Sequence, residues 1–133
     1  MTFVTRSSEA PAPPSILIVN GNRDISEGLA DLLTSKGYAV ESVLYGGSCF
    51  SCIQHRAFSA LILHDRLPDT NGLFLLTAIR IIRPDLPVIV TTASGPCPSV
   101  LLQYAFAVLV LPYQRDELLN ILQRAISATT ATI

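Results

Sequence analysis

The chain has 133 residues, of which 50% are hydrophobic and 14% are charged, and its formal net charge is -1. This length fits one domain with a single core, and the apolar composition excludes a disordered chain. The charged residues form no basic run, so this domain is not expected to bind nucleic acid or an anionic membrane surface directly. The surplus of apolar side chains predicts exposed apolar surface, and therefore a protein partner or a homodimer.

Residues 1–14, MTFVTRSSEAPAPP, are predicted to be a flexible N-terminal tail. They lack the apolar core of a signal peptide and end in an Ala-Pro tract that cannot hold a helix. The longest near-continuous apolar stretch, residues 104–113, is far too short to span a membrane. Three cysteines, two of them three residues apart, do not form the disulfide framework of a secreted protein. We therefore expect a cytoplasmic protein.

After the tail, strand-like and helix-like patterns alternate, which predicts βαβ units around a parallel sheet. The apolar run SILIV, residues 15–19, is typical of a strand buried on both faces. A helix follows, with Asn22 or Asp24 as its N-cap and Gly37 closing its end. Its apolar residues at helical spacing are Ile25, Leu29, Leu32 and Leu33. A weaker second strand is expected over residues 38–44.

The alternation continues to the end of the chain and gives five βα units. A helix over residues 48–57 has Cys49, Phe50 and Ile53 on its inner face, and residues 60–63 form the third strand. The third helix carries Leu73, Leu76, Ile79 and Ile82 at helical spacing. Residues 88–91 form the fourth strand, and the last helix is expected over residues 114–127 with one apolar face.

The pattern weakens between Thr92 and Pro112. Two prolines stand where the fourth helix should begin, and proline is tolerated only in a first turn, so this helix should be short or irregular and start late. Its apolar residues cannot all face inward from so short an element, so part of this surface should be exposed. These residues are Val100, Leu101, Leu102, Tyr104 and Phe106.

A site in an open parallel sheet forms outside the carboxyl ends of the strands, where the strand order reverses. The first strand should lie between the second and the third, which would bring Asn20 and Gly21 close to His64 and Asp65. Thr92 follows the fourth strand, and Leu111 follows the fifth.

Four motifs in this order resemble the receiver domain of two-component response regulators, over about residues 16–127. ILIVNGN is similar to the first strand and its acidic turn, and LILHDRLPDTNG to the phosphoacceptor strand and its loop. PVIVTTA resembles the fourth strand with its hydroxyl residue, and LPYQRDELL the Lys-Pro turn into the last helix. The resemblance implies a flavodoxin-like, or CheY-like, α/β fold: a five-stranded parallel sheet in the order 2-1-3-4-5 with helices on both faces.

Counting along these motifs indicates a degenerate site. In receivers the phosphorylated aspartate stands four residues before the loop proline, a position that matches His64, and Asp65 comes one residue too late. A one-residue offset turns a side chain to the other face of a strand. Asp65 is therefore expected to be a solvated loop acid that does not reach the site without a rearrangement.

The other positions of the set have also changed. The acidic pair that binds the metal ion matches Asn20 and Gly21, the lysine matches Leu111 and the aromatic switch residue matches Val108, whereas Thr92 is retained. Phosphoryl transfer needs a carboxylate nucleophile, Mg²⁺ with hard oxygen ligands and a positive clamp. We therefore predict a pseudo-receiver with no catalytic residues, no metal, no cofactor and no enzymatic activity. It would span residues 15–127, followed by a tail or linker at 128–133.

Three further expectations follow. The resemblance implies a cis peptide bond between Leu111 and Pro112. His64 could sense pH or bind a ligand, although a simpler interpretation has it filling the vacated space, bonded to Thr92 or to backbone. Cys49, Cys52 and His55 form C-x-x-C-x-x-H, but steps of three and six residues spread these groups around a helix, so a structural role is expected and not a metal or haem site.

Two functions remain open at this stage. The first is a signalling module that binds a protein partner, an output domain or a second copy. Its surface would be the fourth helix, fifth strand and last helix, which receivers commonly use, with Val100, Leu101, Tyr104, Phe106 and Val108. The second is a small-molecule sensor that uses the vacated pocket of Asn20, Gly21, His64, Thr92 and Leu111.

Overall fold

The computed structural model describes residues 13–93 and 103–131, in which strands and helices alternate as far as the fourth strand. The strands are β1 (Ser15–Val19), β2 (Ala39–Val43), β3 (Ala60–His64), β4 (Val88–Thr92) and β5 (Ala107–Val110). They form one parallel sheet in the order β2-β1-β3-β4-β5. The helices are α2 (Arg23–Ser35), α3 (Gly46–His55), α4 (Gly72–Ile82) and α6 (Arg115–Ala131). The predicted fold class and strand order are confirmed.

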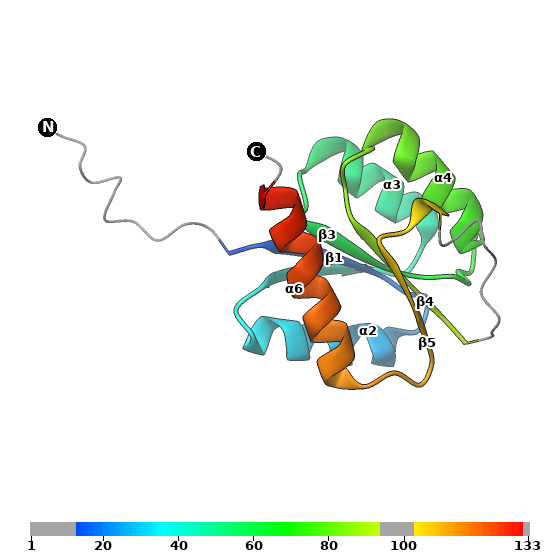
Figure 1. Cartoon of the computed structure of the whole chain (residues 1–133). Coiled ribbons are helices and arrows are strands. Elements are labelled where there is room, and N and C mark those ends of the chain that lie inside the picture. Colours follow the sequence, from blue (N-terminus) through cyan, green and yellow to red (C-terminus); the bar gives the residue numbers. More distant parts are fainter. Residues whose placement is uncertain (1–12, 94–102, 132–133) are drawn as a thin grey trace, which may run out of the picture.

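Alternate strand residues fill two cores, one on each face of the sheet. Residues such as Leu17 and Leu63 pack against α3 and α4, and residues such as Ile16 and Ile62 pack against α2 and α6. Figure 1 shows the same arrangement, with α3 and α4 on one face and α2 and α6 on the other. Because the central strands are covered on both faces, they need apolar residues at every position, which explains the unbroken run in β1.

The ends of α2 follow the sequence prediction. The side chain of Asn22 accepts a hydrogen bond from the backbone N–H of Ile25, so Asn22 is the N-cap and Asp24 lies inside the first turn. Gly37 has a φ of +94°, a conformation that glycine adopts without steric strain, and its N–H donates to the carbonyl of Thr34.

Some helix boundaries differ from those predicted. α3 occupies residues 46–55 instead of 48–57, because the backbone N–H groups of Gly46 and Gly47 are held by the carboxylate of Asp69, which starts the helix early. α6 continues past residue 127 to Ala131, since residues 128–131 contain no glycine or proline to stop it. The predicted late-starting fourth helix falls mainly on residues 94–102, which lie outside the described residues.

The peptide bond between Leu111 and Pro112 is cis, which confirms that prediction. In the part of the chain that the structure describes, no helix combines the length and the apolar character needed to cross a membrane.

Candidate functional site

The carboxyl ends of β1, β3 and β4 meet at one edge of the sheet. In the register between β3 and β4, His64 stands opposite Thr91. Paired residues of parallel strands project from the same face of the sheet, so the residue after His64 comes level with the residue after Thr91. The strand ends therefore form two pairs, His64 with Thr91 and Asp65 with Thr92.

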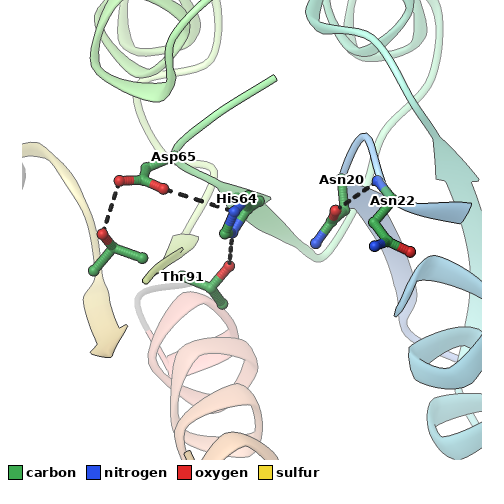
Figure 2. Close-up of polar contacts among 6 residues, drawn as sticks. Asn20, Asn22, His64, Asp65 and Thr91 are labelled. Carbon is green, nitrogen blue, oxygen red and sulfur yellow. Dashed lines mark hydrogen bonds and ion pairs between the residues drawn. The ribbon is translucent and has the colours of Figure 1, made fainter. Parts of the chain in front are cut away.

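His64 is held at the end of β3 by a side-chain hydrogen bond. Its Nδ1 lies 3.0 Å from Oγ1 of Thr91, and its side chain is 17% exposed. Figure 2 shows His64 between Thr91 and Asp65. The sequence predicted a hydrogen bond from His64 to Thr92 or to backbone, whereas the partner is Thr91. The count of residues along β3 does not reveal which residue of β4 stands opposite His64. The simpler interpretation of a hydrogen-bonded histidine at this strand end fits the geometry.

Asp65 was predicted to lie outside the site, but its side chain lies within it, beside Thr92. The hydroxyl of Thr92 donates to Oδ2 of Asp65 at 2.8 Å, and the N–H of Asp65 donates to the carbonyl of Thr91 at 2.9 Å. The Asp65 side chain is only 20% exposed. The prediction of a solvated loop acid is therefore wrong. Asp65 does turn away from the His64 side, but the face it turns to is the one that Thr92 occupies.

The second carboxylate oxygen of Asp65 is poorly satisfied. Oδ1 is buried and has no hydrogen-bond partner among the residues that the structure describes, and Nε2 of His64 is 3.8 Å away. That distance is too long for a hydrogen bond. A buried carboxylate oxygen without a donor costs free energy. Oδ1 of Asp65 is therefore expected to lower the stability of the fold at this edge of the sheet.

Asn20 and Gly21, at the end of β1, are held in place by contacts with neighbouring residues. Oδ1 of Asn20 accepts from the N–H of Asn22 at 2.9 Å, and its carbonyl accepts from the hydroxyl of Ser26 at 3.1 Å (Figure 2 shows the first contact). The side chain of Asn20 is buried. A Cβ on Gly21 would lie 2.8 Å from Cδ of Pro68, so glycine is required there by the packing of the β3–α4 loop.

The Mg²⁺ ion that the family resemblance implies does not fit these residues. Asn20 and Gly21 supply no carboxylate, and the amide oxygen of Asn20 is already used by Asn22. Asp65 would have to share its carboxylate with Thr92. Among the described residues, no three His, Cys, Asp or Glu side chains come together as a metal site. Mg²⁺ usually takes carboxylates in near-octahedral geometry, which this donor set does not provide.

The remaining predicted positions lie around the same edge. Leu111 is partly buried, and its N–H donates to the carbonyl of Thr92 at 2.8 Å, while its side chain carries no charge. Val108 is partly buried against the core on the α3 and α4 face. Tyr104 and Phe106 are 38% and 41% exposed. Val100 and Leu101 lie outside the described residues.

Three of the predicted pocket residues line one open hollow of about 450 Å³. Asn20, Gly21 and His64 form part of its wall, together with Asn22, Ile25, Arg66, Leu67 and Pro68. Arg66, on the loop after β3, is exposed and brings a positive charge to this hollow that the sequence analysis did not anticipate. The hollow is open to solvent, so it can accommodate a polar group but does not enclose one.

Asp69 is a structural residue of the site that sequence reasoning missed. Its two carboxylate oxygens accept from the N–H groups of Gly46 at 2.8 Å and Gly47 at 3.0 Å, so a side chain of the β3–α4 loop caps α3. The hydrogen bonds from Gly46 and Gly47 lower the pKa of Asp69 below its ordinary value. No local signal could have revealed this contact, because the partners are more than twenty residues apart.

The Cys-Cys-His motif is not assembled into a site. Cys49 is fully buried, and its burial, with a smaller contribution from Cys52, raises the pKa of its thiol to about 12. Sγ of Cys52 lies 3.9 Å from a carboxylate oxygen of Glu41, and Nδ1 of His55 lies 2.9 Å from the carbonyl of Ser51. Cys52 and His55 contact different partners and Cys49 lies in the core, an arrangement that fits a structural role.

Comparison with known proteins gives a consistent result. Residues 16–123 match the family model of the response regulator receiver domain. Among curated proteins, the chain is 26% identical over 118 residues to the C4-dicarboxylate transport transcriptional regulatory protein DctD of Rhizobium meliloti. It is 30% identical over 112 residues to the response regulator protein FleR of Pseudomonas aeruginosa. These matches cover 86% and 82% of this chain, and about a quarter of the length of each relative, at 25% and 24%.

Solved structures share the fold. A response regulator receiver domain protein (CheY-like) from Methanospirillum hungatei superimposes with a TM-score of 0.87 at 23% identity, over 91% of this chain and 99% of that one. NtrX from Brucella abortus, solved in complex with ADP, gives a TM-score of 0.83 at 25% identity, over 90% of this chain and 28% of that one.

Proposed function

The chain belongs to the response regulator receiver domain family, and from this premise we propose that it is a protein-interaction module of two-component signalling that works without aspartyl phosphorylation. Receiver domains are signalling modules and are generally not enzymes. The active unit would comprise the predicted residues 15–127 together with the rest of α6, which ends at Ala131. The chain covers about a quarter of DctD and FleR, so an output domain elsewhere in a longer regulator, or a separate partner protein, would complete the signal.

The side chains found at the carboxyl ends of the strands support this proposal. Asn20 and Gly21 stand where the family has its acidic pair, and Leu111 where it has its lysine. The position four residues before Pro68 holds His64, whose ring is bonded to Thr91. Each loss removes a separate requirement of phosphoryl transfer: metal ligands, nucleophile and positive clamp. Asp65 is the one carboxylate near the family position, and it already accepts from Thr92.

The proposed contact surface is the side of the domain formed by β5, α6 and the segment before β5. Tyr104, Phe106 and Val110 are exposed there, at 38%, 41% and 46%, and Val108 is partly buried against the core on the α3 and α4 face. Arg80 of α4 donates from Nε to the carbonyl of Tyr104 at 2.8 Å, which ties this surface to α4. Large exposed apolar side chains on adjoining elements are typical of protein-binding surfaces. Val100 and Leu101, which the sequence also assigns to partner binding, lie outside the described residues.

The test is the intact mass of the protein after incubation with Mg²⁺ and acetyl phosphate, beside a functional receiver as positive control. Wild type is expected to gain no phosphoryl group. The Asp65→Asn variant is the matched control, because it keeps an oxygen for Thr92 but removes the carboxylate. A labile phosphoryl group on wild type that is absent from Asp65→Asn, or one that maps to His64, would overturn the proposal.

A second candidate is a small-molecule sensor. The observation that favours it is the hollow of about 450 Å³ lined by Asn20, Gly21 and His64, with Arg66 as a cation on its rim. A polar or anionic metabolite would fit such a wall. A thermal-shift screen of nucleotides and metabolites tests it, because a ligand of the folded state raises the melting temperature. A shift lost in Arg66→Ala would support this candidate, and the absence of any shift would eliminate it for the compounds tested.

A further inference from the structure

The side-chain amide of Asn20 has a hydrogen-bond donor that the described part of the domain does not use. Asn20 is only 6% exposed, and its Oδ1 accepts from the N–H of Asn22 at 2.9 Å. Because a backbone N–H bonds to the oxygen of an amide, this contact identifies Nδ2 as the donor atom. No described residue accepts a hydrogen bond from Nδ2. Asn20 lines the hollow at the end of β1, so the small exposed part of its side chain opens into that hollow.

The hollow beside this donor has no acidic residue in its wall. Among the described residues that line the space of about 450 Å³, none is Asp or Glu. Arg66 brings a permanent positive charge, and no described residue pairs with its exposed side chain. The carboxylate of Asp65 bonds Thr92 and is not part of the wall, and Figure 2 shows His64 between Asp65 and Asn20. The wall therefore offers hydrogen-bond donors and positive charge.

The start of α2 adjoins the same hollow, because its N-cap, Asn22, is part of the wall. The N–H groups of Ile25 and Ser26 are occupied by the side chain and the carbonyl of Asn22. Those of Arg23 and Asp24 stand in the first turn, where a helix provides no acceptor. The side chains of Arg23 and Asp24 are exposed and opposite in charge, so they add no net charge. The N-terminus of this 13-residue helix favours an anion.

We infer that the hollow binds a phosphate group, held by Nδ2 of Asn20 and by the guanidinium of Arg66 beside the start of α2. A phosphate oxygen supplies the acceptor that Nδ2 lacks, and the negative charge is balanced by Arg66. The donors come from three separate segments of the chain, so a tetrahedral group with four oxygens suits them better than a planar carboxylate. The inference rests on the second candidate function, the small-molecule sensor, and specifies the chemical group that its ligand presents.

Binding of the free ion should be weak. The hollow is open and Arg66 stays in contact with solvent, so we expect a dissociation constant on the order of 1 mM. The test is a titration of nitrogen-15-labelled protein with inorganic phosphate at constant pH and ionic strength, followed by NMR. The side-chain amide of Asn20 and the backbone N–H of Gly21 are expected to shift and to saturate together.

Three variants separate this site from general attraction of anions. Asn20→Asp keeps the oxygen that Asn22 bonds but replaces the donor by an acceptor, so the dissociation constant should rise at least about 10-fold. Arg66→Gln should raise it about two- to fivefold, since an exposed charge contributes modestly. Arg124→Gln is the matched control, because Arg124 is an exposed arginine of α6 outside the hollow. The backbone N–H of Gly21 reports binding in every variant, and circular dichroism verifies that each variant folds.

Two further ligands define the chemical class. Acetate should bind more weakly than phosphate. Glycerol phosphate should bind through the same residues: tighter binding than that of inorganic phosphate would assign the site to a phosphate monoester, and weaker binding would assign it to the free ion. Either result supports the inference.

The inference would be overturned by a wild type that shows no saturable shift at Gly21, by acetate binding as tightly as phosphate, or by an equal loss of binding in Arg124→Gln and Arg66→Gln. A shift that persists in Asn20→Asp would also overturn it. If Asn20→Asp does not fold, the comparison of Arg66→Gln with Arg124→Gln still decides. If phosphate fails but another compound raises the melting temperature in the thermal-shift screen, this inference falls and the sensor function stands.

Discussion

Asp65 follows the last residue of β3, and only one of its two carboxylate oxygens receives a hydrogen bond from the described part of the chain. Oδ2 accepts from Thr92, whereas Oδ1 is buried and no described residue donates to it. Counting along the sequence ended the third strand at Leu63, one residue before the end of β3, and it gave Asp65 the wrong surroundings. The missing information was the pairing of His64 with Thr91, a relation between two strands that neither strand encodes alone.

Replacing Asp65 by asparagine should not weaken the domain. The asparagine amide puts a neutral group in place of the buried oxygen, which recovers part of the about 1–3 kcal/mol that an unsatisfied buried group costs, and a neutral bond to Thr92 in place of a charged one loses about 1 kcal/mol. We expect the unfolding free energy of Asp65→Asn at pH 7, from urea denaturation, to be unchanged or up to about 2 kcal/mol higher. Asp65→Ala, which removes an acceptor of the Thr92 hydroxyl, should be about 1–2 kcal/mol less stable. A loss above about 1 kcal/mol in Asp65→Asn would contradict this account.

At the scale of elements, the starts of α2, α3 and α4 obtain their hydrogen-bond acceptors in two ways, from a local side chain or from a distant loop. α2 and α4 are capped locally by Asn22 and Asn71, which accept from Ile25 and Phe74. α3 has no side-chain cap from Tyr45 and relies on Asp69 of a distant loop. Local caps follow sequence rules, so the α2 start was predictable, whereas the α3 start depends on tertiary structure and was placed two residues late.

The Asp69 cap should make α3 sensitive to acid. Because hydrogen bonds from Gly46 and Gly47 lower its pKa below 3.8, Asp69 stabilises the fold above that value, and the contribution is lost as the pH falls through the lowered pKa. The stability difference between wild type and Asp69→Asn should be largest near pH 7 and shrink below about pH 4. Carbon-13 NMR titration of the Asp69 carboxyl should give a midpoint below 3.8.

Asn22→Ala is the matched control for this experiment. It removes a cap that does not titrate, so its cost, about 1 kcal/mol, should stay constant over the same pH range. An Asp69→Asn difference that is equally independent of pH, or an Asp69 midpoint above 3.8, would mean that the carboxylate does not hold the start of α3 in solution.

At the scale of the whole molecule, the sheet joins two cores into one structure. Leu76 of α4 and Leu122 of α6 are both fully buried, on opposite faces of the same five strands. The alternation of patterns and the unbroken apolar strands predicted this layering, since a parallel sheet must be covered on both faces. The exposure of Phe74 and Ile81 on α4, at 66% and 81%, was not predicted, because helical spacing identifies the buried stripe and leaves the other side unspecified.

Because the cores share one sheet, the domain should unfold as a single cooperative unit. Leu76→Ala and Leu122→Ala should each lower the unfolding free energy by about 2–5 kcal/mol. Either loss is a large fraction of the roughly 5–15 kcal/mol of an ordinary domain, so the double variant should be near the limit of folding. Far-ultraviolet circular dichroism and tyrosine fluorescence should follow one urea transition in each single variant. Separate transitions for the two probes would show that the faces unfold independently.

The contact between Gly72 and Asp65 determines where a tag, label or new segment can be inserted into this domain. The N–H of Gly72 donates to the carbonyl of Asp65 at 2.7 Å, and a Cβ at this position would lie 2.7 Å from Cα of Asp65. The length of the loop from Asp65 to Gly72 is therefore fixed. An added residue in this loop, or a side chain at Gly72, would displace the Asp65 carboxylate from Thr92. Gly37 has open space around it and closes a turn that faces solvent. An insertion is therefore better placed at Gly37 than in the loop between Asp65 and Gly72.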